Sequence, residues 1–365
     1  MDFSFNLPVI IKYGNSALAD IAKAHTKQNL FIMASGSVYK TGILDSIPTL
    51  FQPNKYMFYT GITPNPDIKE LLATFAIAKD FGADLLLAIG GGSVLDAAKC
   101  IAVMLANNGE IAACKSDSMH NPPIPLICAP TTSGTGSEVT NVSVITDNQE
   151  KRPYVSNALW PKYACIVPKL SYSMPRKVAA ETGWDAFCHA FEAYWSKGSN
   201  PFSDTLAKSA IKLILQNIED SANSSIEQAR DNMSYASLLA GMAFSQTRTT
   251  APHAVSFLLT SVYGLSHGRA CAITLSGFIE YCNGYWDKKQ KQLLDFLGFS
   301  SFEDFKGDLL LKLEQTGMPI KLSQVGLAKE DILLLAQEGI KHSIAHQMPR
   351  TITAPSLQKV LESLL

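Results

Sequence analysis

Two patterns of hydrophobic positions divide the chain. In the first part, short apolar runs alternate with segments whose apolar residues recur at helical spacing, such as 67–81 and 93–106. The apolar runs, which are typical of buried strands, lie near residues 30–34, 56–59, 85–89, 125–129 and 163–167. This alternation predicts β-α-β units around a parallel sheet.

Beyond about residue 169, helical spacing dominates and few strand-like runs remain. The segments with this spacing are 177–195, 202–219, 226–244, 253–263, 287–296, 302–316 and 329–342. We therefore expect two domains. Residues 1–165 should form an α/β domain with a Rossmann-like parallel sheet, and residues 166–365 an all-α domain.

The composition narrows the classes of partner. Of the 365 residues, 47% are hydrophobic and 17% charged, which is enough to bury the cores of two domains. The net charge of −1, without a run of Lys or Arg, argues against binding to nucleic acid or to an anionic membrane. The seven cysteines form no CxxC pair, and the N-terminus shows no secretion signal. These features predict a cytoplasmic protein.

A strand, a glycine turn and a helix follow one another in residues 84–104. Gly90, Gly91 and Gly92 let backbone N–H groups approach a phosphate, and the start of the next helix favours negative charge. We expect Ser93 to cap that helix. Asp96 lies too near the anion to bind it, so it should accept a hydrogen bond from the nicotinamide amide or from the backbone. The alternative is an ordinary tight turn.

A second segment rich in small polar residues follows the next apolar run, in IPLICAPTTSGTGSEVT. Thr131, Thr132 and Thr135 offer hydroxyls beside two glycines, as expected for a loop that contacts a ligand. A surface loop of low complexity is the alternative. Neither GxGxxG nor GxxxxGK[ST] is present.

Four residues at two spacings suggest a metal site. Asp185 and His189 are four apart in a helical segment, so both side chains project from one face. His253 and His267 lie 14 apart in apolar text. One carboxylate and three imidazoles suit Fe²⁺, Zn²⁺ or another divalent metal, with one position left for a substrate. The alternative for each is a hydrogen-bonded residue of the core.

Taken together, these motifs resemble the iron-containing (group III) alcohol dehydrogenases, which share the dehydroquinate synthase-like architecture. The matching segments are Thr63-Pro-Asn65-Pro, Gly90-Gly-Gly-Ser-x-x-Asp96-x-x-Lys99, Pro130-Thr-Thr-x-Gly-Thr-Gly-Ser-Glu138, Gly183-x-Asp185-Ala-x-x-His189-Ala-x-Glu192, Leu238-Leu-Ala-Gly-Met-Ala-Phe244, His253-Ala and His267-Gly. The resemblance implies that the glycine turn holds the pyrophosphate and that the TTSGTGSE segment contacts the nicotinamide. It further implies that Asp185, His189, His253 and His267 bind the catalytic metal, and that the protein is a homodimer.

The resemblance also bears on the choice of cofactor. Asn65 belongs to a matching segment, and Lys151 falls where the family often has a lysine near the nicotinamide ribose, although Arg152 is the other residue that could align there. Where an acidic residue would bind the ribose of NAD, the chain has Ser35, followed by Gly36, Ser37 and Lys40. A hydroxyl and an ammonium suit a 2′-phosphate, so we expect NADPH to be preferred over NADH.

The chain departs from the common family pattern at Phe257 and at the pair Arg248–Thr249. Phe257 stands where many members carry a second histidine after the third ligand, so a proton relay through that imidazole is missing. Arg248 and Thr249 stand just before His253, where small or apolar residues are common, and they resemble the phosphonoacetaldehyde reductase branch. We expect them to bind an anionic aldehyde such as phosphonoacetaldehyde. The alternatives are a dehydrogenase for uncharged short-chain alcohols, with Arg248 in a structural ion pair, or a metal-dependent lyase of the dehydroquinate synthase type.

Overall fold

The computed structural model describes residues 2–115, 121–147 and 150–365, without the side chain of Lys40. The chain divides into two compact units, each described here by itself. The sheet unit comprises Leu7–Thr132 and Gly136–Met174. The helical unit comprises Met1–Asn6, Ser133–Thr135 and Pro175–Leu365.

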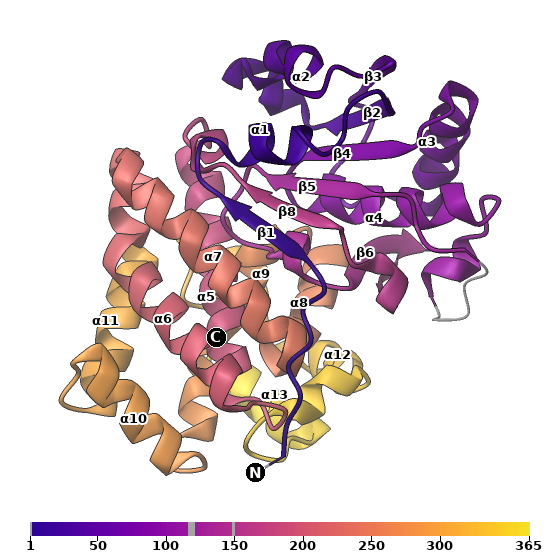
Figure 1. The fold of residues 1–365 in the computed structure, drawn as a ribbon. Coiled ribbons are helices and arrows are strands. Elements are labelled where there is room, and N and C mark those ends of the chain that lie inside the picture. Colours follow the sequence, from indigo (N-terminus) through magenta and orange to yellow (C-terminus); the bar gives the residue numbers. More distant parts are fainter. Residues whose placement is uncertain (1, 116–120, 148–149) are drawn as a thin grey trace. The chain divides into compact units, whose positions relative to one another are not determined.

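A six-stranded parallel sheet forms the centre of the sheet unit (Figure 1). The strands are β1 (Ile10–Tyr13), β2 (Asn29–Ala34), β3 (Lys55–Tyr59), β4 (Leu85–Gly90), β5 (Leu126–Pro130) and β8 (Tyr163–Ile166). Their order is β1-β8-β5-β4-β2-β3. A separate antiparallel hairpin, β6 (Val142–Asp147) and β7 (Glu150–Val155), and the edge strand β1 add to the strands expected from the apolar runs.

Helices cover both faces of this sheet. Successive residues of β2 point to opposite sides: Leu30 and Ile32 pack with α1 (Ala17–Ala22) and α2 (Ile43–Phe51). Phe31 and Met33 pack on the other side with α3 (Ile68–Phe81) and α4 (Gly92–Ala106). Burial on both faces explains why the central strands β2, β4, β5 and β8 are continuous apolar runs rather than alternating ones.

The helical unit is built around one buried helix, α5 (Arg176–Trp195), in which every residue from Gly183 to Trp195 is buried. The other helices are α6 (Pro201–Glu219), α7 (Glu227–Thr247), α8 (Ala251–Ser261), α9 (His267–Cys282), α10 (Asp287–Leu297), α11 (Phe302–Gln315), α12 (Lys329–Gly339) and α13 (Ala354–Glu362). Of these, α6, α7 and α9 pack directly on α5. The predicted fold class, a parallel α/β part followed by a helical part, is confirmed. Among the described residues, no helix is long and apolar enough to cross a membrane.

A charged group of buried side chains lies beneath β6 in the sheet unit. The Lys99 ammonium donates to Thr140 Oγ1 at 3.1 Å and to the Val142 carbonyl at 2.8 Å. It also lies 3.7 Å from Asp96 Oδ1. Glu138 is only 2% exposed, and burial raises the pKa of its carboxyl to about 7. Glu138 therefore changes its charge near neutral pH inside the core.

We expect Glu138→Gln to alter how stability depends on pH. Between the ordinary pKa of 4.5 and the folded value of about 7, the folded protein binds a proton that the unfolded chain has released. This contribution is therefore fully present below pH 4.5 and is lost as the pH rises through 7. Urea unfolding at pH 5 and 8 should show a loss of about 3 kcal/mol in the wild type that Glu138→Gln lacks. Identical losses in both proteins would contradict the assignment.

Candidate active site

Four predicted metal ligands lie together in the helical unit. Asp185 and His189 come from α5, His253 from the first turn of α8, and His267 is the first residue of α9. One potential ligand atom from each lies within 4.8 Å of those from the other three. His253 Nε2 lies 3.0 Å from His189 Nε2 and 3.7 Å from Asp185 Oδ1, and His267 Nε2 lies 3.6 Å from that same oxygen.

Hydrogen bonds fix the orientation of two of these imidazoles. His189 Nδ1 lies 3.2 Å from the Gly134 carbonyl oxygen, and His253 Nδ1 lies 2.5 Å from Glu192 Oε1. A carbonyl and an ionised carboxylate only accept, so each Nδ1 carries the proton and each Nε2 faces the cluster. Burial lowers the pKa of His189 to about 4, which keeps this ring neutral at pH 7.

The cluster therefore concentrates electron pairs at one buried point. Burial lowers the pKa of His253, but Cys271 and Glu192 raise it by more, so that it lies well above its ordinary value. A proton on His253 Nε2 then separates the two facing nitrogens, and a divalent cation would take the place of that proton. One carboxylate oxygen and three imidazole nitrogens fit Fe²⁺ or Zn²⁺.

One side of the cluster is open to solvent. The His267 side chain is 33% exposed, whereas the side chains of the other three are only 3–6% exposed. The ring of Phe244 stacks on His189 at 4.2 Å, and Cys271 Sγ lies 3.8 Å from His267 Nε2. His267 is thus the one of the four side chains that a small molecule in solution can reach.

The close approach of α9 to α5 depends on a glycine. A Cβ atom at Gly268 would lie 1.9 Å from the Glu181 carbonyl oxygen and 3.2 Å from Asp185 Cβ. No other residue lets His267 begin α9 at this distance from α5.

Two neighbours of the cluster were not among the predicted site residues. Glu192 follows His189 by three positions on α5, and Cys271 follows His267 by four on α9, so helical spacing alone would have placed both beside a ligand. Phe257, which replaces the expected relay histidine, contacts the ring of His342 with centroids 4.9 Å apart. An imidazole therefore still lies next to this position, contributed by a distant segment.

Predicted cofactor residues meet at one end of the sheet, where β5, β4 and β2 are neighbours. The Thr131 N–H donates to the Gly90 carbonyl at 2.9 Å, and the Ser35 N–H donates to the Ile89 carbonyl at 3.0 Å. A Cβ on Gly91 would lie 3.5 Å from Thr132 Oγ1. The carboxyl ends of adjacent parallel strands are where nucleotides bind in such sheets.

The glycine turn differs from expectation in its cap. Gly91, not Ser93, is the N-cap of α4, and as a glycine it makes no side-chain capping hydrogen bond. Ser93 lies within the helix instead, and its Oγ accepts from the Asn65 N–H at 3.1 Å. The expected cap was wrong because Gly92 already has helical geometry. The first N–H groups of α4 remain available to an anion.

The other predicted cofactor residues are placed as follows. Gly36 and Ser37 begin a 3-10 helix, and Ser37 Oγ lies 3.0 Å from Ser35 Oγ. The side chain of Lys40 lies outside the described part of the chain. Asp96 accepts from the Val144 N–H at 2.9 Å and from Ser137 Oγ at 2.5 Å, so the expected hydrogen bond from the backbone is formed.

The remaining two predicted cofactor residues, Lys151 and Thr135, lie on different segments. Lys151 is in β7, opposite Thr146 of β6. Thr135 belongs to the short stretch Ser133–Thr135 of the helical unit, next to the carbonyl of Gly134 that holds His189.

Arg248 and Thr249 form the connection between α7 and α8. Arg248 has φ 63° and ψ 171°, a conformation that L-residues rarely adopt. Its side chain is half-buried, and burial lowers the pKa of the guanidinium. In the part of the chain that the structure describes, the hydrogen bonds of Arg248 are made by its backbone N–H and carbonyl, and its guanidinium has no hydrogen-bond or ion-pair partner.

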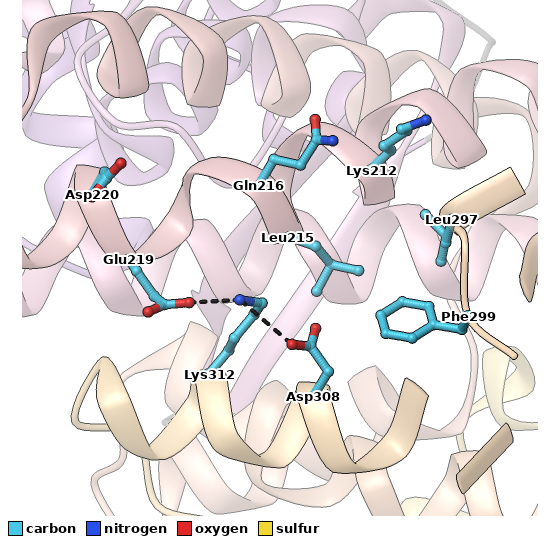
Figure 2. A pocket seen from close by; sticks show the side chains of 9 residues that line it. All are labelled: Lys212, Leu215, Gln216, Glu219, Asp220, Leu297, Phe299, Asp308 and Lys312. Carbon is cyan, nitrogen blue, oxygen red and sulfur yellow. Dashed lines mark hydrogen bonds and ion pairs between the residues drawn. The ribbon is translucent and has the colours of Figure 1, made fainter. Parts of the chain in front are cut away.

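A separate cavity of about 430 Å³ lies elsewhere in the helical unit (Figure 2). Its lining residues are Lys212, Leu215, Gln216, Glu219, Asp220, Leu297, Phe299, Asp308 and Lys312. Lys312 lies 2.6 Å from Glu219 and 3.6 Å from Asp308, so its charge is already neutralised. None of the four clustered ligands lines this cavity, and we assign no chemistry to it.

Two family models together match almost the whole chain. The iron-containing alcohol dehydrogenase model matches residues 8–168, and the C-terminal model of the Fe-containing alcohol dehydrogenase family matches residues 179–365. The chain belongs to the iron-containing alcohol dehydrogenase family. It is thus an oxidoreductase that acts on alcohols with a nicotinamide cofactor.

Individual relatives of this alcohol dehydrogenase support the assignment. The 1-propanol dehydrogenase PduQ of Salmonella typhimurium is 30% identical over 99% of the chain and 100% of its own length. Alcohol dehydrogenase 4 of Schizosaccharomyces pombe is 29% identical over 99% and 88%. The crystal structure of sulfoacetaldehyde reductase from Bifidobacterium kashiwanohense in complex with NAD+ has a TM-score of 0.93 at 31% identity, covering 100% of this chain and 99% of that one.

We expect Gly268→Ala to weaken metal binding by this dehydrogenase at least tenfold. The added Cβ must push α9 away from the Glu181 carbonyl and carry His267 away from Asp185, at a cost of about 1–3 kcal/mol in folding stability. Chelator competition with Co²⁺ and thermal unfolding would measure both effects. Gly277→Ala is the control on the same helix, because the three atoms nearest to its Cβ all belong to the side chain of Leu364, the nearest at 2.9 Å, and none belongs to the backbone of α5. Equal metal affinity in both variants would contradict the prediction.

Proposed function

We propose that this enzyme reduces a small anionic aldehyde with NADPH, at a divalent metal held by Asp185, His189, His253 and His267. The observation that carries the substrate assignment is Arg248. Its half-buried guanidinium lacks a partner in the described chain and lies five residues before His253.

A half-buried arginine without a partner lowers the stability of the folded protein unless a ligand pairs with its guanidinium. Partial burial of an unpaired charge and a left-handed backbone conformation both oppose folding, and such features gather at functional sites. A guanidinium binds phosphonate, sulfonate or carboxylate through two parallel hydrogen bonds. The adjacent Thr249 hydroxyl offers a further donor. These properties support an aldehyde with a tetrahedral anionic group, of which phosphonoacetaldehyde is our first candidate.

One of these relatives supports the same substrate class. The Bifidobacterium protein is described as a sulfoacetaldehyde reductase, and its substrate also joins an aldehyde to a tetrahedral anion. The 1-propanol dehydrogenase favours a second candidate, a dehydrogenase for uncharged short-chain alcohols. The two candidates differ in whether Arg248 contributes to catalysis, and that difference can be measured.

Different residues of the chain have different roles in the proposed reaction. A bound Fe²⁺ or Zn²⁺ would supply a Lewis acid for the carbonyl group. Arg248 would hold the anionic end of the substrate, and Phe244 would keep water from the buried side of His189. Holding the aldehyde carbon in one orientation toward the nicotinamide accounts for much of the rate in such transfers.

The cofactor half of the proposal rests on the carboxyl ends of β2, β4 and β5. The glycine turn with its uncapped α4 would bind the pyrophosphate, and the hydroxyls of Ser35 and Ser37 would face the ribose phosphate. The seven cysteines are buried and free, which supports our expectation of a cytoplasmic location. A homodimer is our expectation from the family.

We expect Arg248→Ala to remove the preference for anionic aldehydes. With anaerobic, Fe²⁺-loaded enzyme and NADPH, kcat/KM for phosphonoacetaldehyde relative to butanal should fall about 100-fold, because a charge-assisted bidentate contact is lost. A parallel series with sulfoacetaldehyde would distinguish phosphonate from sulfonate. Arg248→Lys should recover part of the preference, and Arg176→Ala, an exposed arginine on α5, should keep it. Equal rates with both aldehydes in the wild type and in Arg248→Ala would favour the uncharged-alcohol candidate.

We expect Ser35→Asp to reverse the cofactor preference. The wild type should have the higher kcat/KM with NADPH, since no acidic residue lies between Ser35 and Gly42. A carboxylate at this position accepts from ribose hydroxyls and repels a 2′-phosphate, so the NADPH/NADH ratio should fall at least tenfold. Ser35→Asn, which has the same shape without the charge, is the control. A wild type that prefers NADH would overturn the assignment.

A further inference from the structure

Glu192 is a fully buried carboxylate, and both of its oxygens accept hydrogen bonds. Its Oε1 accepts from His253 Nδ1 at 2.5 Å. Its Oε2 accepts from both the backbone N–H of Thr250, at 2.6 Å, and the Thr250 hydroxyl, at 2.9 Å. The indole N–H of Trp195 donates to that same hydroxyl at 3.0 Å. Glu192 thus joins a candidate metal ligand to the backbone at the start of α8.

We propose that Glu192 is a positioning residue that couples the metal ligand His253 to the substrate-binding connection Arg248–Thr250. The proposal rests on the proposed function, because it takes His253 as a ligand and Arg248 as the anion-binding group.

The contact with His253 sets which nitrogen is available for metal. An ionised carboxylate at Nδ1 requires a proton there, and this leaves Nε2 as the donor that faces the cluster. His189 obtains the same tautomer from a neutral backbone carbonyl, that of Gly134. A carboxylate oxygen of Asp185 lies 4.0 Å from His189 Nδ1, beyond hydrogen-bond distance, whereas Glu192 Oε1 lies 2.5 Å from His253 Nδ1. This direct contact with a carboxylate increases the basicity of His253 and so strengthens its bond to a cation.

The contact with Thr250 fixes the other end of the coupling. Thr250 is the N-cap of α8, and its own side chain makes no capping hydrogen bond. Glu192 holds its N–H and hydroxyl instead, which determines where α8 begins. Arg248 lies two residues earlier in the left-handed conformation, so its direction depends on this anchored point. A change at Glu192 should therefore disturb metal affinity and anion selectivity together.

Glu192→Gln tests the coupling with almost no change of shape. The side-chain amide has one accepting atom, whereas His253 Nδ1–H and the Thr250 N–H need two, so one of these contacts must fail. Binding of Co²⁺ to the apoprotein, measured by chelator competition, should weaken 10- to 100-fold, with an altered visible spectrum of the bound Co²⁺. The ratio of kcat/KM for phosphonoacetaldehyde to that for butanal should also fall. A merely structural carboxylate would lower the melting temperature without changing the Co²⁺ spectrum.

Matched controls separate the possible failures. Glu219→Gln changes a carboxylate of the same unit that pairs with Lys312, and it should bind Co²⁺ like the wild type. His267→Ala should lose Co²⁺ binding. If His267→Ala binds Co²⁺ as tightly as the wild type, the proposed metal centre fails. If His267→Ala loses Co²⁺ but Glu192→Gln retains wild-type affinity, spectrum and selectivity, only the coupling fails.

A measurement on the unmodified protein covers the case in which Glu192→Gln does not fold. Imidazole ¹⁵N spectra of the wild-type apoprotein, assigned with His253→Gln, should show His253 protonated at Nδ1. A tautomer with its only proton on Nε2 would overturn the proposal.

Discussion

Four electron-donating side chains converge at one buried point of the helical unit, and the positions of the helices that carry them must satisfy this constraint. Facing imidazole nitrogens 3.0 Å apart repel each other unless a positive charge lies between or beside them. Such an arrangement persists only where the surroundings fix each ring. Here a carbonyl oxygen, a buried carboxylate and the close contact of two helices do so, and each restricts one ligand.

The sequence predicted the features that depend on regular spacing. Asp185 and His189 share a helix face in the helical unit, and in the sheet unit three glycines at the end of an apolar run form the strand–turn–helix for which we predict phosphate binding. Contacts made by backbone atoms could not be predicted in this way. The partner of His189 is the backbone carbonyl of Gly134, so the residue type at position 134 does not indicate the contact. Glu192 was visible in a motif, but its partner His253 is 61 residues away, so its role required the three-dimensional structure.

The elements of the fold were likewise predicted where the sequence has a regular pattern and missed where it has none. The central strands of the sheet are covered on both faces and read as continuous apolar runs, so they were predicted. The β6–β7 hairpin is partly exposed and contains polar residues throughout, and the edge strand β1 is exposed at Ile10 and Tyr13, so neither matched that pattern. The expected serine cap failed for a local reason, because a glycine before it already supplied the extended conformation.

The partial exposure of His267 bears on how a metal would reach this site. Three of the four proposed ligands are held inside the helical unit, whereas the fourth faces water at the first turn of α9. An ion bound by these residues would exchange from that side without unfolding of α5, and metal loading and chain folding would then be separable events. Under such conditions the occupant follows from free-ion concentrations and from the general order of divalent affinities, in which zinc exceeds iron. Whether a cell produces an iron or a zinc enzyme from this chain becomes a question of metal supply.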